Sequence, residues 1–172
     1  RVTGSIYSDL IYGSDDADDF RGMGGYDWFV GSGGGRDRYD GGSGYDMISY
    51  AGSAAGVSAS LLLSRGTGGD AAFDLYTSIE RLTGSNHADQ LIGDNDRNEL
   101  RGMYGQDQLF GNGGVDRLMG GGSDDYLHGG NGFDYAIFSG DRADYTVATN
   151  AVGTTTVAHN AGGSDGTDTL VD

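Results

Sequence analysis

The sequence contains no cysteine and no lysine, and it has no long apolar run. Without cysteine the chain has no disulfide framework and no cysteine-based zinc site. That absence is compatible with export, although small secreted domains more often carry disulfides. No stretch approaches the roughly 18 apolar residues of a transmembrane helix, and no signal peptide opens the chain. We therefore expect no membrane span.

Positive charge is also scarce. All ten basic residues are arginine, the acidic residues number 26, and the formal net charge is −16. Such a chain repels phosphate, so we expect no nucleic-acid partner. Only Glu80 and Glu99 among the acidic residues are glutamate. The dominance of aspartate fits ligation from tight turns, because the shorter side chain keeps its carboxylate close to the backbone oxygens.

Glycine, by contrast, is abundant, with 35 residues placed at a regular period. Residues 84–137 divide into six nonamers without an insertion: GSNHADQLI, GDNDRNELR, GMYGQDQLF, GNGGVDRLM, GGGSDDYLH and GGNGFDYAI. Glycine fills the first place of each, Asp or Asn the sixth, and an apolar residue the eighth. Residues 4–49 hold five more nonamers and one extra residue, Gly31. We expect Gly31 to form a local bulge, to which the positive φ of glycine is suited.

The residue types of one nonamer predict its structure. Glycines in the first half allow left-handed backbone, which bends into a tight turn and aims carbonyl oxygens to one side. The sixth-place aspartate adds a carboxylate, and carbonyl and carboxylate oxygens are the ligands that Ca²⁺ prefers. The last three places form a short strand whose middle side chain faces the interior. Two nonamers make one coil, so each nonamer stacks on the next but one, with an ion between the stacked turns.

The predicted fold class is therefore all-β, a parallel β-roll with two sheets of short strands and 18 residues per coil. We divide the chain into a first roll block (1–49), connecting β-strands (50–83), a second roll block (84–137) and flanking or capping β-strands (138–172). Residues 57–63 alternate as in a half-buried strand, and residues 145–158 suggest a hairpin. We read the connecting strands as prolonging or flanking the roll, and both chain ends as cuts from a longer protein.

These nonamers resemble those of the RTX (repeats-in-toxin) family, bacterial proteins exported by type I secretion. The resemblance covers 4–49 and 84–137. It implies a right-handed roll, about seven Ca²⁺ ions, passage through the type I secretion machinery, and an extracellular location. In the family, sixth-place carboxylates bridge successive ions and carbonyls of the first four places complete the shell.

Carried over to this chain, the resemblance implies a set of metal ligands at the sixth places and in the glycine turns. The sixth-place residues are Asp9, Asp18, Asp27, Asp37, Asp46, Asp89, Asn98, Asp107, Asp116, Asp125 and Asp134. The glycines are Gly22, Gly24, Gly33, Gly35, Gly42, Gly44, Gly102, Gly105, Gly111, Gly114, Gly120, Gly121, Gly130 and Gly132. Asn98 lacks a carboxylate, so we expect weaker binding beside it. Tyr7, Asp16, His87, Asp96 and Ser123 stand where the fourth place of the pattern has glycine.

These features predict a non-catalytic module that folds on binding Ca²⁺ outside the cell and supports secretion and stability of a larger exported protein. Charge repulsion and glycine entropy should exceed what a thin core offers, so we expect the ion-free chain to be unfolded. About seven ions would offset most of the negative charge. We find no catalytic residues. His87, His128 and His159 are isolated, and the G-x-S-x-G match at 162–166 lacks its strand-to-helix context.

An alternative function is recognition of an extracellular glycan or a host protein, as in an adhesin or an accessory module of an alginate-epimerase-like protein. Trp28, Phe110, Tyr126 and Tyr135 occupy places seven and nine, so we expect them to point outward. Outward aromatic rings either stack on sugars and partners or pack under flanking strands. The nonamers do not identify the activity of a parent protein, because such blocks are attached to unrelated catalytic domains.

Overall fold

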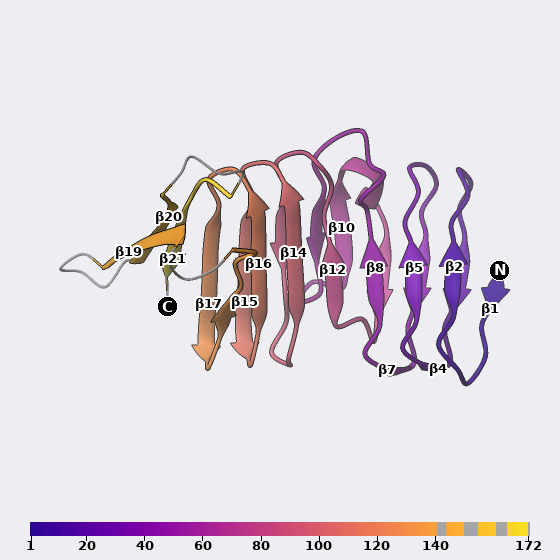
Figure 1. Cartoon of the computed structure of the whole chain (residues 1–172). Helices are drawn as coiled ribbons and strands as arrows, with labels where there is room; N and C mark the ends of the chain where they lie inside the picture. Colours follow the sequence, from indigo (N-terminus) through magenta and orange to yellow (C-terminus); the bar gives the residue numbers. More distant parts are fainter. Residues whose placement is uncertain (141–143, 150–154, 161–164, 172) are drawn as a thin grey trace.

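The structure, a computed structural model, describes residues 1–140, 144–149, 155–160 and 165–171. In these residues the chain is a parallel β-roll of two facing sheets, and η1 (Gly69–Ala71), a 3₁₀ turn, is the one helix that lies wholly within the described ranges. Figure 1 shows the strands crossing the long axis of the roll, with the N-terminus at one end and the C-terminus near the other. The predicted fold class is confirmed.

Sheet A is the longer of the two sheets. In spatial order it contains β1 (Val2–Thr3), β3 (Asp19–Arg21), β6 (Arg38–Asp40), β11 (Leu75–Thr77), β10 (Arg65–Gly68), β9 (Ser58–Ser60), β13 (Gln90–Ile92), β15 (Gln108–Gly114), β17 (Tyr126–Gly132), β21 (Thr167–Val171), β20 (Thr155–His159) and β19 (Tyr145–Thr149).

Sheet B faces it. In spatial order it contains β18 (Tyr135–Ala136), β16 (Arg117–Gly122), β14 (Glu99–Tyr104), β12 (Arg81–Thr83), β8 (Met47–Ser49), β5 (Trp28–Val30) and β2 (Leu10–Tyr12). A small pair, β4 (Gly24–Gly25) and β7 (Ser43–Gly44), joins two stacked turns.

The interior is filled by the eighth-place side chains. Within a block, each pairs with the eighth-place residue of the next coil, as Leu91 does with Leu109 and Leu109 with Leu127. These side chains alternate with outward-facing neighbours, which is the two-residue period of a strand. From Phe20 to Leu127 the row is almost completely buried, and Ala136, in the last strand of sheet B, is exposed.

Residues 50–83 lie inside both sheets. The strand β12 pairs in parallel with β8 on one side and with β14 on the other, while β11 pairs with β6 and β9 with β13. These strands therefore prolong the roll from one block into the next. The expected strand over 57–63 is shorter than predicted: the chain turns after Leu61, Ser64 has φ 55°, and Leu63 is exposed.

The inserted Gly31 serves a different purpose from the one expected. It does not adopt positive φ. A Cβ atom there would instead collide with the ring of Tyr50, which is completely buried. Glycine is required at this position because a large aromatic side chain occupies the adjoining space.

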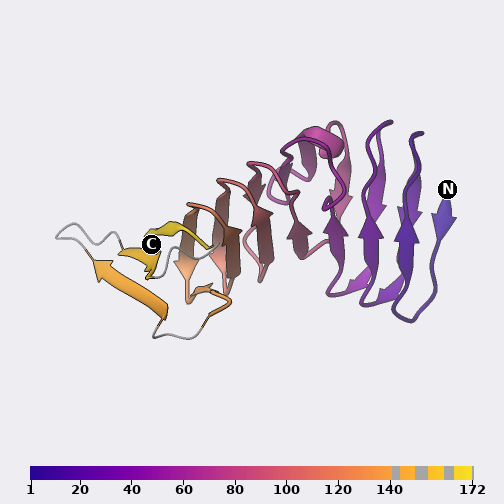
Figure 2. The ribbon, with the colours of Figure 1, turned by 45° about the horizontal axis from the view of Figure 1, so that its top comes forward.

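The C-terminal hairpin is present as predicted. β19 and β20 are antiparallel, with Val147 opposite Val157, and β20 also pairs with β21. β21 is in turn parallel to β17, so the hairpin extends the end of sheet A, as Figure 2 shows. The expected hairpin turn at 150–153 and the G-x-S-x-G match lie partly or wholly outside the described residues.

Candidate metal centre

The sixth-place side chains form hydrogen-bonded ladders along both sheets. In each rung, one carboxylate oxygen accepts the backbone N–H of the sixth-place residue in the preceding coil. Examples are Asp27 Oδ1 with Asp9 N (2.9 Å) and Asp107 Oδ1 with Asp89 N (2.8 Å). The structure thus places the predicted residues in register, one above another, beside the strand starts.

Three further acidic residues continue these ladders where no nonamer exists. Asp74 Oδ1 accepts the N–H of Asp37 at 3.0 Å, and Glu80 Oε2 accepts that of Asp46 at 2.8 Å. Asp168 Oδ1 accepts the N–H of Asp125 at 3.0 Å. Sequence reasoning missed all three. Their signal is an acidic residue two places before a residue of the core row: DLYT, ERLT and DTLV.

The nonamer turns that precede the sixth-place residues fall into two main kinds. Six of them, which we call open turns, have positive φ at the second and fourth places, as at Met103 (90°) and Gly105 (126°). They begin at Gly22, Gly41, Gly102, Gly111, Gly120 and Gly129. The turn with Ser123 at its fourth place belongs to this kind, since Ser123 also has φ 90°. Serine in place of glycine at the fourth place therefore does not change the turn.

Open turns leave one carboxylate oxygen without a partner. The Oδ2 atoms of five aspartates are buried and accept no hydrogen bond: Asp27, Asp46, Asp107, Asp116 and Asp125. A buried, unpaired charge is costly, so such an oxygen calls for a cation or a proton.

The first-place glycines border the same oxygens. A Cβ atom on Gly22 would lie against Asp27 Oδ2 and 2.6 Å from the carbonyl oxygen of Gly41 in the next stacked turn. On Gly102 it would meet Asp107 Oδ2 and, at 2.5 Å, the carbonyl oxygen of Gly120. Glycine therefore preserves a space bounded by carboxylate and carbonyl oxygens from two turns. Oxygens of this kind, at about 2.3–2.6 Å, are the donors that Ca²⁺ takes.

Backbone oxygens must supply the remaining donors. Within the described ranges, no three His, Asp or Glu side chains converge as a ready-made metal cluster. That fits sites built from turns, in which carbonyls outnumber side chains. The residues present therefore fit Ca²⁺ through their donor set.

The other main kind, which we call capped turns, uses the same oxygen internally. Ser5 N donates to Asp9 Oδ2 at 2.6 Å, and Ser85 N donates to Asp89 Oδ2 at 2.6 Å. The serine hydroxyls donate to the same carboxylates. The four capped turns begin at Gly4, Gly13, Gly84 and Gly93. They are the first coil of each block, where Tyr7, Asp16, His87 and Asp96 replace glycine.

Burial governs the protonation of the ladder carboxylates. It raises the pKa of Asp107 to about 7 and the pKa values of Asp116 and Asp125 to about 6, while the backbone N–H bond of each ladder rung opposes the rise. Nearby carboxylates raise these pKa values further. A cation beside these oxygens would favour their charged form.

The predicted glycines divide by role. Eight have positive φ: Gly35, Gly42, Gly44, Gly105, Gly114, Gly121, Gly130 and Gly132. Four are first-place glycines beside carboxylate oxygens: Gly22, Gly102, Gly111 and Gly120. Gly24 instead pairs with Ser43 in β4, and a Cβ on Gly33 would meet Asp70. Gly41, Gly84 and Gly129 were not predicted, yet they border the carboxylate oxygens as the other first-place glycines do.

Sequence comparison agrees with this geometry. The chain matches the RTX calcium-binding nonapeptide repeat in four copies, at residues 1–29, 32–48, 83–118 and 101–136, which together cover more than half of its length. The chain belongs to the RTX calcium-binding repeat family. RTX repeats bind Ca²⁺ and are typical of proteins exported by type I secretion. A search of curated proteins found no significant match.

The family assignment leaves the surface of this RTX chain to be described. In the described part, no helix is long and apolar enough to span a membrane. Trp28 is 45% exposed and Tyr135 is 58% exposed, both on the outer face of sheet B. Phe110 packs against Tyr126 and His128 on the outer face of sheet A, with ring centroids 5.8 and 6.1 Å away.

Proposed function

We propose that this chain is a non-catalytic RTX module whose folding is driven by Ca²⁺ after export, and which thereby stabilises a larger secreted protein. The observation that carries the proposal is the set of buried, unpaired Oδ2 atoms in the open turns. Without a cation these carboxylates oppose folding, and with one they join stacked turns. Bound Ca²⁺ supplies positive charge and takes oxygen ligands from two turns at once.

The number of tight sites follows from the two kinds of turn. Seven stacked nonamer pairs give about seven ions by the repeat pattern. In three of those pairs the carboxylate facing the space is unpaired, namely those of Asp27, Asp107 and Asp116. We propose that these three pairs bind most tightly. Pairs whose turn is capped bind more weakly, since the ion must displace a serine or aspartate N–H.

The expected energy is large enough to control folding. When the free Ca²⁺ concentration is about a thousand times the dissociation constant of a site, binding at that site stabilises the folded state by about 4 kcal/mol. Three such sites contribute about 12 kcal/mol, which is comparable to the entire net stability of about 5–15 kcal/mol of an ordinary domain.

Far-ultraviolet circular dichroism with and without Ca²⁺ tests the proposal. We expect a disordered spectrum in chelator and cooperative β-structure at millimolar Ca²⁺, with Mg²⁺ as a control that does not restore it. A cooperative fold that persists in chelator would contradict the proposal.

A groove on sheet B supports a second candidate function, recognition of an acidic glycan. The groove, of about 630 Å³, is lined by Tyr26, Gly44, Tyr45, Arg81, Arg97 and Glu99. The guanidinium groups of Arg81 and Arg97 lie 5.9 and 5.3 Å from the centroid of the Tyr45 ring. Arginine binds carboxylates in a planar fork, and exposed aromatic rings such as that of Tyr26 stack on sugars.

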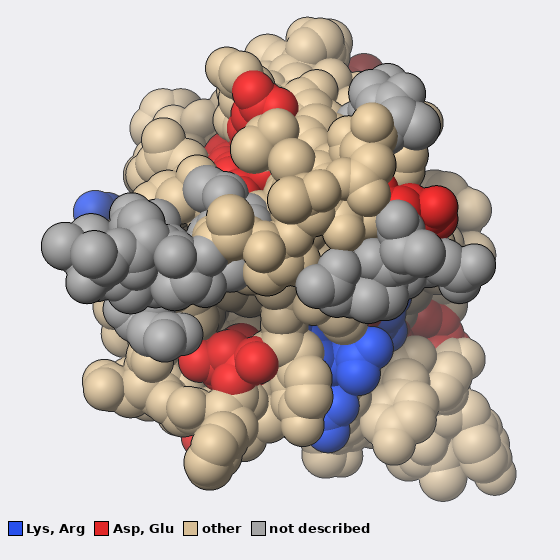
Figure 3. Space-filling view, turned by 60° about the vertical axis from the view of Figure 1, so that its left-hand side comes forward, with Lys and Arg blue, Asp and Glu red and all other residues tan. Residues whose placement is uncertain are grey.

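Basic side chains gather beside this groove, although the chain as a whole is strongly acidic. Arg81, Arg101 and Arg117 surround Glu99 at 2.6 to 3.8 Å. Figure 3, a view toward the end of the roll where the C-terminus lies, shows a strip of basic side chains among scattered acidic ones.

Retention on a polyuronate column tests this candidate, with neutral dextran as the reference. We expect retention of the calcium-loaded protein, lost in Arg97→Gln and kept in Arg36→Gln, whose arginine lines a different cavity. Equal elution from both columns would contradict it.

A further inference from the structure

At one place an open turn of the first block faces the connecting segment instead of another nonamer. The turn 41–46 is open, but its next neighbour along sheet B is the segment 78–80, which has no glycine repeat. Asp46 is fully buried, and its Oδ2 has no hydrogen-bond partner. An unpaired carboxylate oxygen therefore faces a segment to which the repeat pattern assigns no role.

The distances there match those of the nonamer pairs. A Cβ atom on Gly41 would lie 2.5 Å from Asp46 Oδ2 and closer still to the carbonyl oxygen of Ser78. In the nonamer pair that begins at Gly111, the corresponding carbonyl oxygen, that of Gly129, lies 2.5 Å from the same position. The Ser78 carbonyl thus takes the place of a first-place glycine carbonyl. Ser78 holds this orientation with φ 50°, and Gly41 N donates to Thr77 O at 3.0 Å.

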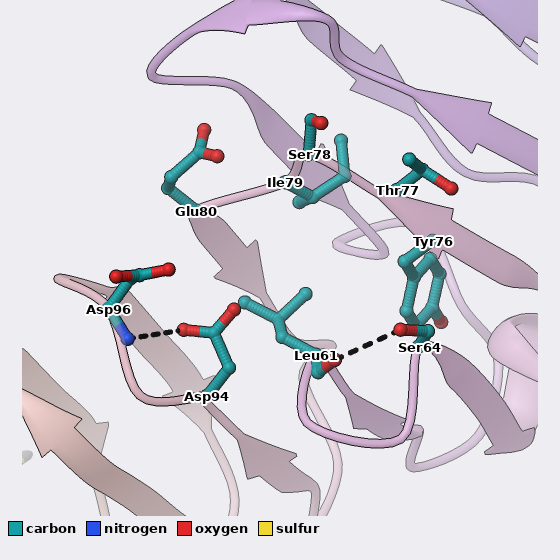
Figure 4. Close-up of a pocket in the computed structure, with 9 residues that line it drawn as sticks. All are labelled: Leu61, Ser64, Tyr76, Thr77, Ser78, Ile79, Glu80, Asp94 and Asp96. Atoms are coloured by element: carbon teal, nitrogen blue, oxygen red, sulfur yellow. Dashed lines mark hydrogen bonds between the residues drawn. The ribbon is translucent and has the colours of Figure 1, made fainter.

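Glu80 provides a second carboxylate at this junction. Its Oε2 accepts the N–H of Asp46 at 2.8 Å, the same rung that aspartate makes elsewhere. The other oxygen of Glu80, Oε1, is not part of this rung. Glu80 and Ser78 also border a cavity of about 380 Å³ that Asp94 and Asp96 line from the neighbouring turn. Figure 4 shows these three carboxylates around the cavity, which lies beside Ser78 and Glu80.

The opposite edge of the same segment is closed by tyrosines. Asp37 Oδ2 accepts the hydroxyl of Tyr39 at 3.2 Å, and Asp74 Oδ2 accepts that of Tyr50 at 2.8 Å. The Tyr50 and Tyr76 hydroxyls are 2.9 Å apart. Hydroxyl groups therefore satisfy the carboxylates on that side, whereas no such group reaches Asp46 Oδ2.

We propose that a divalent cation of the calcium type binds between the turn 41–46 and the segment 78–80. Its ligands from this chain are Asp46 Oδ2, the carbonyl oxygen of Ser78 and the carboxylate of Glu80. This inference rests on the proposed calcium-dependent folding and adds a site outside the repeats. The row of ions along sheet B then continues past the first block and fastens β8 to β12, which carries the roll into the second block.

Counting bound Ca²⁺ in matched variants tests the site. Glu80→Gln keeps the shape and an oxygen acceptor for Asp46 N, but it removes the negative charge. The control is Asp19→Asn, which removes one negative charge from a side chain that is 41% exposed and lies beside Arg1 in sheet A. After removal of free Ca²⁺, elemental analysis should give one ion fewer per chain for Glu80→Gln and the wild-type count for Asp19→Asn. The Ca²⁺ concentration at half-folding should rise several-fold in Glu80→Gln alone.

Crystals of the wild-type chain grown with Ca²⁺ give an independent answer if Glu80→Gln does not fold. Anomalous density beside Asp46 Oδ2 and the Ser78 carbonyl would support the site. Two results would overturn the junction site and leave the proposed function intact. One is anomalous density between nonamer turns with none beside Asp46 Oδ2, and the other is an unchanged ion count in folded Glu80→Gln. A wild-type chain that folds without binding Ca²⁺ would overturn the proposed function as well.

Discussion

The two roll blocks share open and capped turns but have different cores. One turn of the first block, which begins at Ser32, is of neither kind, since its positive φ angles are at Gly34 and Gly35. In the second block the core row from Leu91 to Leu127 is leucine throughout, and stacked residues are 18 apart. In the first block the row contains Phe20, Phe29 and Tyr39, and Tyr39 pairs with Phe20 at a separation of 19. Those rings pack closely, with centroids 5.2 Å apart for Phe20 and Tyr39.

The comparison shows which part of a nonamer is constrained. Larger side chains are accommodated in the core of the first block, and the extra residue Gly31 is followed by a turn of different geometry. The open turn is preserved in both blocks, because Asp27 and Asp107 both keep a buried, unpaired Oδ2 beside a first-place glycine. The oxygen geometry therefore limits variation more than the packing does. Within each block, capped turns give the contrast, since they have the same period but no buried, unpaired carboxylate oxygen.

The largest predicted effect separates open from capped turns. Asp107→Asn removes a buried charge that faces the turn of Gly120, so stability in Ca²⁺ should fall by about 3–5 kcal/mol. Asp18→Asn changes an exposed capped turn and should cost less than about 1 kcal/mol. Urea unfolding at saturating Ca²⁺ measures both. Equal losses would remove the distinction between the turns.

A smaller effect is expected from filling the space beside the carboxylate. Gly102→Ala places a methyl group against Asp107 Oδ2 and the Gly120 carbonyl, and should cost about 1–3 kcal/mol while raising the Ca²⁺ midpoint of folding. In the capped turn, Gly13→Ala meets chiefly the hydroxyl of Ser32, a side chain that can rotate away. Calcium titrations followed by circular dichroism compare the two. A Gly102→Ala midpoint equal to that of wild type would be evidence against an ion in that space.

The join between the blocks is predicted to depend on hydrogen bonds. Tyr50→Phe leaves Asp74 Oδ2 without the Tyr50 hydroxyl in a buried site, so unfolding free energy should fall by about 1–2 kcal/mol. The number of bound ions should not change, because tyrosines close this edge of the roll. Thermal unfolding together with elemental analysis checks both points, and loss of an ion would contradict the closed edge.

The smallest effect concerns Asn98. The repeat pattern alone predicts that Asn98→Asp, which restores a carboxylate, tightens Ca²⁺ binding markedly. The structure predicts a change of less than about 0.5 kcal/mol, because Asp94 N at 2.7 Å already caps this position. Isothermal titration calorimetry distinguishes the two, with Asp116→Asn in the open turn of the same stack as the reference.

Much of the fold could be predicted because it depends on local spacing. The nine-residue period places Leu91 and Leu109 in one row without knowledge of long-range contacts. Glu80, Asp74 and Asp168 were missed because each lacks the glycines that mark a repeat. The role of Gly31 depends on a contact with Tyr50 across the coil, which spacing does not reveal. The capped turns carry a local signal, Ser5, Ser14 and Ser85 at the second place, where the repeat pattern has glycine.

The predicted ligands remain predictions until ions are located. The most direct measurement is anomalous diffraction from crystals of this chain grown in millimolar Ca²⁺. We predict the strongest peaks beside Asp27, Asp107 and Asp116, with weaker or no density at the capped turns of Asp9, Asp18 and Asp89. An ordered roll without density at the three open pairs, or with full occupancy only at the capped turns, would contradict the account.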